Sequence, residues 1–307
     1  MIFDAHCDVL YKMWLNENIS FVDSEILHIN YENLVFAGGK VQCFAIYIPE
    51  SVRFNDRFNV ALEMIDIFYE RVLKLNPKLK LVLEKRDILK LKDDEIGAIL
   101  TLEGCDAIGH DIVKLKTLFR LGVRSIGLTW NYANAVADGA LENRNGGLSN
   151  FGKEVVELNN QLNIWTDVSH LGEASFWDTI GIAKFPIASH SNAYSLFHHP
   201  RNLKDDQIKA IIQKNGVIGI TFVPYFLSED YHNVHIKDVM NHIDYICSLG
   251  AEKNIGLGSD FDGIDDMVKG LENYRCYEML IIELQKHFSD EQISRICYQN
   301  FVDHFPK

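Results

Sequence analysis

The chain has 307 residues, 47% of them hydrophobic, so it can bury the core of one large α/β domain or of two ordinary ones. Its formal net charge is −13 and no cluster of lysine and arginine forms a basic stripe, which argues against a nucleic-acid partner. The six cysteines are scattered without a C-x-x-C pair, which argues against a zinc ribbon and a dithiol redox site.

The two ends of the sequence carry no targeting signal. No charged and apolar leader precedes "MIFDAHCD", and "NFVDHFPK" is neither a hydrophobic tail nor a lipidation signal. We expect the cysteines to be buried, reduced thiols. Together these features predict a cytoplasmic protein without a membrane partner.

Short apolar runs alternate with longer segments of helical period along the whole chain. The eight runs that we predict as strands are "MIFDAH" at 1–6, "VQCFAIYI" at 41–48, "IGAILTLE" at 96–103, "VRSIGLTW" at 123–130, "NIWTDVSH" at 163–170, "FPIASH" at 185–190, "GVIGITFV" at 216–223 and "NIGLGSD" at 254–260. Nearly continuous apolar runs are expected for a parallel sheet buried on both faces. The run "KLKLVLE" at 78–84 is a candidate ninth strand.

Amphipathic segments between these runs have apolar residues three and four positions apart, which predicts helices that cover the sheet. They lie at 56–75, 151–162, 204–215 and 236–250, and two further helices are expected at 277–288 and 290–305. Eight β/α repeats fit a TIM-like (β/α)8 barrel, with a doubly wound open sheet as the alternative. No Pro/Gly/Ser-rich linker divides the chain, so we predict a single catalytic barrel domain over 1–307.

The first predicted strand ends in the pattern Asp-x-His-x-Asp. Its members are Asp4, His6 and Asp8. Residues two apart in a strand point to the same face, so His6 and Asp8 could aim at one metal ion. Taken alone, the pattern is better explained by a strand end that turns into a loop, with His6 hydrogen-bonded and Asp8 capping a helix that begins at Val9.

Acids and histidines also end other predicted strands. They are Glu103 after the third strand, His170 after the fifth, His190 after the sixth and Asp260 after the eighth. Such residues are costly to bury unless they are paired or bound to metal, and in a TIM barrel these strand ends meet at one mouth. The set suits zinc or another divalent first-row metal, and one bridging carboxylate could hold two ions. A structural role is plausible for any one histidine but not for all three together.

These motifs resemble the membrane (renal) dipeptidase family of zinc dipeptidases, which includes soluble bacterial members. The resemblance runs through "DAHCD", "LTLEGCDAIG", "LGVRSIGLTWNYANAVADG", "GLSNFGKEVVELNNQLNIWTDVSH", "ASHSNAYSLFHHPRN", "GVIGITFV" and "IGLGSDFDG". It implies a barrel of the metal-dependent hydrolase type that binds two zinc ions. The implied ligands are His6 and Asp8 on one ion, His170 and His190 on the other, and Glu103 bridging both.

The resemblance further implies hydrolysis of the peptide bond of dipeptides, including those with a C-terminal D-residue, by a hydroxide that bridges the zinc ions. Asp260 would be the proton shuttle, with Glu103 beside it in the catalytic set. Arg201 would hold the substrate's C-terminal carboxylate, since a guanidinium binds a carboxylate with two hydrogen bonds. Family members often form dimers, so a homodimer is a further option.

One position departs from the family pattern. Mammalian members carry a histidine at the end of the fourth strand, where this chain has Trp130 followed by Asn131. We therefore expect Trp130 and Asn131 to contact the substrate, with Asn131 as the substitute donor to the tetrahedral intermediate. For the substrate's amine, an acid such as Asp23 or Asp138 is the candidate partner.

Two other functions remain open from the sequence. The same metal site could serve an amidohydrolase that acts on another small amide or ester, such as an N-acyl amino acid or a lactone. The barrel could also be a metal-stabilised binding protein without activity, although such a protein would not need Asp260.

Overall fold

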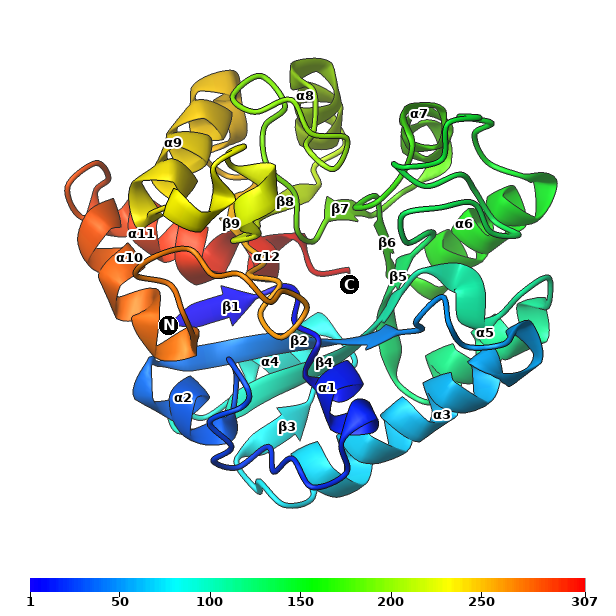
Figure 1. Ribbon diagram of the computed structural model, residues 1–307, viewed down its shortest axis with the longest axis horizontal. Helices are drawn as coiled ribbons and strands as arrows, with labels where there is room; N and C mark the ends of the chain where they lie inside the picture. Colours follow the sequence, from blue (N-terminus) through cyan, green and yellow to red (C-terminus); the bar gives the residue numbers. More distant parts are fainter. Residues whose placement is uncertain (307) are drawn as a thin grey trace.

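The computed structural model describes residues 1–306 and is a closed barrel of parallel strands with helices around it (Figure 1). Its strands are β1 (Ile2–Asp4), β2 (Gly39–Tyr47), β3 (Leu79–Leu81), β4 (Ile96–Glu103), β5 (Val123–Gly127), β6 (Trp165–Asp167), β7 (Pro186–Ala188), β8 (Val217–Ile220) and β9 (Ile255–Leu257). Pairing of β2 with β4 and of β9 with β1 closes a ring of eight strands. The TIM-like barrel is therefore confirmed, and the doubly wound sheet is excluded.

The candidate strand at 78–84 exists as β3 but is not part of the barrel ring. It pairs with the first residues of β4, from Ile96 to Ala98, while the later residues of β4 pair with β5. Of the barrel strands, β1, β5, β6, β7, β8 and β9 are all shorter than predicted, and only β2 and β4 keep about the predicted length. The polar ends of those predicted runs lie in loops, because residues such as His170 and Asp260 adopt positive φ angles of 67° and 64° that no strand allows.

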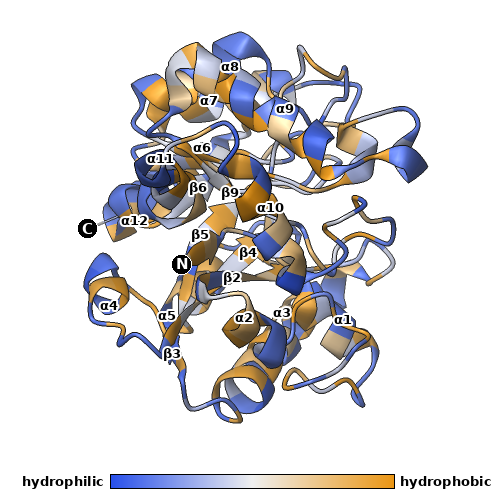
Figure 2. Ribbon diagram, turned by 90° about the vertical axis from the view of Figure 1, so that its left-hand side faces the viewer, coloured by the Kyte–Doolittle hydropathy of each residue, from blue (hydrophilic) through white to orange (hydrophobic). Residues whose placement is uncertain are grey.

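Helices cover the outside of the ring. They are α1 (Val9–Leu15), α2 (Tyr31–Phe36), α3 (Arg57–Ile67), α4 (Lys85–Leu89), α5 (Ile112–Arg120), α6 (Asn150–Leu162), α7 (Glu173–Ile182), α8 (Asp205–Gln213), α9 (Ile236–Ile246), α10 (Tyr277–Leu284), α11 (Asp290–Ser294) and α12 (Asn300–His304). Figure 2 shows hydrophobic residues along the interior strand β5 and hydrophilic ones on outward-facing turns. No helix in residues 1–306 is long and apolar enough to cross a bilayer.

An aromatic cluster closes the end of the barrel where the strands begin. The rings of Phe3 in β1 and Phe301 in α12 stack with centroids 4.9 Å apart, and the ring of Trp165 meets that of Phe301 edge-on at 6.1 Å. Gly256 in β9 leaves the space that Phe301 fills, because a Cβ at position 256 would overlap its ring. The C-terminal helices thus anchor the closed end and leave the opposite end open.

The closed end gives the first prediction. Replacing Phe301 with alanine should lower the free energy of unfolding by about 3–5 kcal/mol, since it removes a buried ring and leaves a cavity. Phe54 has 64% of its surface exposed, so Phe54→Ala should change the free energy of unfolding by less than about 0.5 kcal/mol. Urea denaturation of both variants measures the difference. Equal effects would show that Phe301 does not anchor the barrel.

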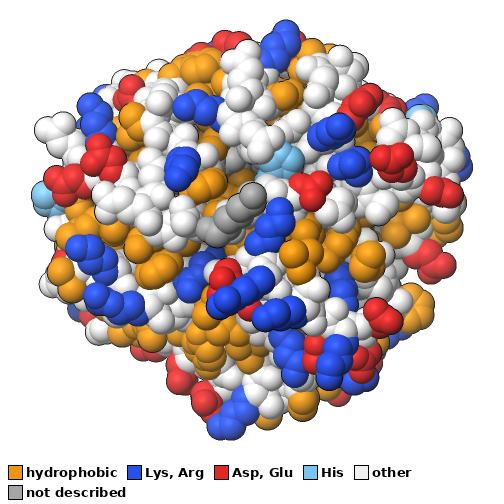
Figure 3. Space-filling model, turned by 180° about the vertical axis from the view of Figure 1, so that it is seen from behind, with side chains coloured by type: hydrophobic (Ala, Val, Ile, Leu, Met, Phe, Trp, Pro, Cys, Tyr) orange, Lys and Arg blue, Asp and Glu red, His pale blue; other side chains and the backbone are white. Residues whose placement is uncertain are grey.

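The face seen from behind the view of Figure 1 carries charges of both signs. There, several lysine and arginine side chains lie next to one another in the lower centre of the view, with acidic and hydrophobic ones around them (Figure 3).

Candidate metal centre

The segment after β1 directs two side chains into the open mouth of the barrel. Asp4 is buried and accepts hydrogen bonds from the backbone N and the Oγ of Ser259, which ties the end of β1 to the loop after β9. Asp8 stands just before α1, but its side chain does not cap that helix. Instead, Asp8 Oδ2 lies 3.2 Å from His6 Nε2, and Asp8 Oδ1 is buried without a hydrogen-bond partner. The alternative prediction, that the Asp8 side chain caps the helix beginning at Val9, is therefore wrong.

Glu103, the last residue of β4, lies between two sets of histidines. Its Oε2 is 3.5 Å from His6 Nε2, while its Oε1 is 3.0 Å from His170 Nε2 and 3.9 Å from His190 Nε2. The nearby imidazoles hold the pKa of this buried carboxyl well below its usual range. Glu103 is consequently an anion that faces both halves of the cluster.

The loops after β6 and β7 bring two neutral imidazoles together. His170 Nε2 lies 2.8 Å from His190 Nε2. Burial, with the Arg201 cation nearby, lowers the pKa of His170 to about 3, and burial together with the His6 charge lowers the pKa of His190 well below its usual range. Neither ring is protonated at neutral pH.

A neighbouring side chain fixes which nitrogen of the His170 ring carries the proton. His170 Nδ1 donates to Asn131 Oδ1 at 2.9 Å, and His190 Nδ1 lies 2.7 Å from Ser189 Oγ. The Nε2 lone pair of His170 therefore points at His190 Nε2 and at a carboxylate oxygen of Glu103. Imidazole nitrogens and a carboxylate gathered in this way fit divalent metal ions with mixed nitrogen and oxygen ligands.

Asp260 completes the cluster from the loop after β9. Its Oδ1 lies 3.6 Å from His6 Nε2, and burial raises the pKa of its carboxyl. Two groups of side chains have ligand atoms close enough to share an ion, namely His6 with Glu103 and His190, and His6 with Asp8 and Asp260. Of the seven acids and histidines named from the strand ends, all except Asp4 are therefore brought together.

Gly263, which sequence reasoning missed, lets the loop after β9 approach the cluster. A Cβ at position 263 would overlap Asp8 Oδ2 and Asp260 Oδ1. We expect Gly263→Ala to displace both carboxylates and to weaken metal binding by roughly 10- to 100-fold, the size of effect seen when groups that position metal ligands are altered. Competition of the purified protein with a zinc-binding dye measures this change. Gly181→Ala, which has open space around it, is the matched control and should leave metal affinity unaltered.

Arg201 is a buried cation at the edge of the cluster. Its side chain is 4% exposed, its Nη2 donates to the His190 carbonyl at 3.2 Å, and its Nε has no hydrogen-bond partner among residues 1–306. Burial lowers its pKa to about 10, and the carboxylates of Asp260 and Glu103 oppose that shift, so the guanidinium stays charged at neutral pH. A buried, partly unsatisfied guanidinium is suited to bind an anion from the open mouth.

The mouth is a pocket of about 510 Å³ in which these side chains meet an aromatic wall. Trp130 and Asn131 line it, and the ring centroid of Trp130 lies 5.3 Å from that of Tyr47. Besides lining the pocket, Asn131 holds His170 in place through its Oδ1, a second role that the sequence did not reveal. No signal in the sequence marks this role, because Asn131 lies 39 residues away from His170 along the chain.

Two expected residues are not brought to this pocket. The carboxylate of Asp138 accepts hydrogen bonds from Arg144 and from the backbone of Gly146, outside the metal cluster. Asp23 lines a different hollow beside His28. The proposal that either acid binds the substrate's amine is therefore wrong, because Asp138 is bound to Arg144 and Asp23 lies in a different hollow.

Comparison with known proteins agrees with this geometry. The family model of membrane dipeptidase (peptidase family M19) matches residues 1–306. An uncharacterized dipeptidase of Schizosaccharomyces pombe is 29% identical over 98% of this chain and 79% of its own length. A crystal structure of a family M19 metallopeptidase, dipeptidase AC, superposes with a TM-score of 0.93 at 26% identity, covering 99% of this chain and 97% of the other.

A second solved structure carries a bound ligand. It is a metallopeptidase from Rhodobacter sphaeroides in complex with a phosphinate mimic of the dipeptide L-Ala-D-Ala. It superposes with a TM-score of 0.93 at 25% identity, covering 99% of this chain and 98% of the other.

Proposed function

Because this chain belongs to the membrane dipeptidase family, peptidase family M19, and is thereby a metallopeptidase, we propose that it hydrolyses the peptide bond of dipeptides with two bound zinc ions. The observation that carries the proposal is the position of Glu103, whose two carboxylate oxygens face His6 on one side and the pair His170 and His190 on the other. One carboxylate between two sets of ligands is the arrangement that a two-metal hydrolase needs.

In this proposal, His6 and Asp8 would hold one ion, His170 and His190 would hold the other, and Glu103 would be shared by both. Zinc ions bound there would polarise the scissile carbonyl and lower the pKa of water toward about 7. Asn131 keeps the His170 ring in the tautomer that presents Nε2 to the cluster, and Ser189 Oγ lies 2.7 Å from His190 Nδ1. The unpaired Asp8 Oδ1 gives that carboxylate a further free acceptor.

Asp260 acts as the proton carrier. Its carboxylate lies at the edge of the pocket and within reach of the cluster, 3.6 Å from His6 Nε2. It would take a proton from the attacking water and deliver it to the leaving amine. Its left-handed backbone conformation holds the side chain in this position, a strain that is common at functional sites.

Arg201 anchors the C-terminal carboxylate, and Trp130 and Asn131 contact the rest of the dipeptide from the aromatic side of the pocket. The bound mimic of L-Ala-D-Ala in the Rhodobacter sphaeroides relative supports the acceptance of a C-terminal D-residue.

The role of Arg201 gives a prediction. Arg201→Ala should raise the KM for L-Ala-L-Ala by roughly 10- to 100-fold, because a charge-assisted hydrogen bond to the substrate carboxylate contributes about 1.5–3 kcal/mol. The control is a dipeptide amide, which lacks the carboxylate. If the variant and the wild-type protein differ as much on the amide as on the acid, Arg201 does not bind the carboxylate.

A substrate panel tests the proposed function itself. Amine release detected with ninhydrin is measured for L-L and L-D dipeptides, for a tripeptide and for an N-acetyl amino acid. Cleavage confined to free dipeptides supports the proposal. Cleavage of the N-acetyl amino acid in their place would support the alternative of an amidohydrolase acting on another small amide.

We also propose that the whole chain works as one catalytic domain, and that it does so in the cytoplasm, since all six cysteines are free thiols. The family resemblance keeps a homodimer as an option. Gel filtration with light scattering measures the oligomeric state directly.

A further inference from the structure

A second cavity adjoins Arg201 on the side away from the aromatic wall. Its volume is about 220 Å³, and it shares His170 and Arg201 with the pocket of the metal cluster. One water molecule needs only about 10–15 Å³ of such space. The cavity therefore has room for a substrate side chain next to the guanidinium that is proposed to bind the substrate's carboxylate.

Backbone hydrogen bonds make this cavity a built feature rather than a gap between loops. Ala140 N donates to the His170 carbonyl at 2.7 Å, and Gly172 N donates to the Asp138 carbonyl at 3.0 Å. Asn145 Oδ1 accepts from Ala174 N at 2.8 Å in the first turn of α7. The loop between β5 and α6 is thus fixed against α7, and its residues form one wall of the cavity.

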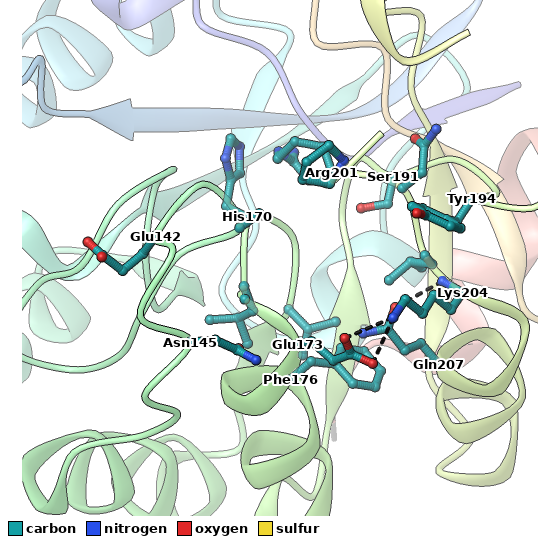
Figure 4. Close-up of a pocket in the computed structure, with 17 residues that line it drawn as sticks. Glu142, Asn145, His170, Glu173, Phe176, Ser191, Tyr194, Arg201, Lys204 and Gln207 are labelled. Carbon is teal, nitrogen blue, oxygen red and sulfur yellow. Dashed lines mark hydrogen bonds and ion pairs between the residues drawn. The ribbon is translucent and has the colours of Figure 1, made fainter. Parts of the chain in front are cut away.

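The charges along the cavity are unevenly matched. Lys204 Nζ donates to both carboxylate oxygens of Glu173, at 2.9 and 2.8 Å, so these two charges neutralise each other. Glu142 forms no ion pair within residues 1–306, and the neighbouring Arg144 is already bound to Asp138. Figure 4 shows Glu142 and Lys204 on opposite sides of the cavity, with Arg201 between them.

Arg201 would itself be neutralised by a bound substrate carboxylate. The cavity lining then holds two carboxylates, those of Glu142 and Glu173, against the single ammonium of Lys204. The remaining field is negative and favours a positively charged group. Val168, Leu171 and Phe176 also line the cavity and offer apolar surface to a methylene chain.

We propose that this cavity receives the side chain of the dipeptide's C-terminal residue and selects side chains that end in a cation, such as lysine, ornithine or arginine. The inference rests on the proposed function, because the α-carbon beside the carboxylate lies next to the cavity only if Arg201 binds that carboxylate. The ammonium or guanidinium would then lie on the Glu142 side of the cavity.

The test compares L-Ala-Lys with L-Ala-norleucine, which has a side chain of similar length without the ammonium, and with L-Ala-Glu, each with the C-terminal residue in L and D form. We expect the wild-type kcat/KM to favour lysine over norleucine by roughly fivefold, the size expected for one partly exposed ion pair. Glutamate should be the poorest substrate. Glu142→Gln should bring the lysine-to-norleucine ratio close to one.

Glu154→Gln, an exposed acid on α6, is the matched control and should keep the wild-type ratio. A wild-type enzyme that cleaves norleucine and lysine dipeptides equally well would overturn this inference and leave the dipeptidase proposal standing. The same holds for a lysine preference that Glu142→Gln does not alter. Failure to cleave any dipeptide would overturn the proposed function and this inference with it.

Discussion

Replacing Glu103 with glutamine is expected to lower kcat/KM on dipeptides by at least roughly a thousandfold and to reduce the zinc content of the purified protein. Glutamine keeps the size of the side chain but removes the negative charge that faces His6 and His170. Several kcal/mol of transition-state stabilisation in metal hydrolases depend on correctly held ions. Elemental analysis of zinc per chain and dipeptide hydrolysis measure the two effects together.

Glu154→Gln serves as the control here as well, because this acid lies exposed on α6, away from the cluster. It should keep both the zinc content and the activity of the wild-type protein. A Glu103→Gln protein that is folded, retains its full zinc content and hydrolyses dipeptides at the normal rate would exclude Glu103 as a shared ligand.

Asp260→Asn should give a different pattern, with loss of turnover and retention of metal. The amide cannot carry a proton between water and the leaving amine, and general acid–base catalysis contributes about 100- to 10,000-fold to rate. The ligand set of Glu103, His170 and His190 is left intact, so at least one metal position should stay filled. We therefore expect kcat to fall within that range while most of the zinc remains bound.

The control for Asp260 lies in the same loop. Asp265 has a side chain that is 93% exposed, and Asp265→Asn should leave kcat at the wild-type level. Near-normal turnover by Asp260→Asn would contradict the proton-carrier role. Loss of zinc in step with turnover would instead make Asp260 a metal ligand, as its place beside His6 and Asp8 allows.

Much of the fold and of the cluster could be predicted from the sequence because both depend on local patterns. Apolar runs such as the one that became β4 predict buried parallel strands, and Glu103 stands at the end of such a run. His6 and Asp8 were recognisable from their spacing of two residues. In a barrel, the ends of all strands meet at one mouth, so residues far apart in the sequence could be assigned to one site.

What the sequence could not reveal depends on contacts between distant segments. The hydrogen bond from His170 to Asn131 joins two loops. The need for glycine at 263 arises only because the loop after β9 passes close to Asp8. Asp138 looked available for a substrate amine, yet Arg144, six residues further on, occupies it. The two-residue period of a strand and the period of a helix reflect only residues that are close along the chain, so they do not reveal such pairs.

Removing and restoring the metal while following dipeptide hydrolysis tests the central claim most directly. The protein is freed of metal with a chelator, and zinc is then added in measured steps with L-Ala-D-Ala or L-Ala-L-Ala as substrate. The account predicts no hydrolysis without metal and a rate that rises until two zinc ions per chain are bound. Full hydrolysis by the metal-free protein, or zinc binding that never restores cleavage of any dipeptide, would contradict it.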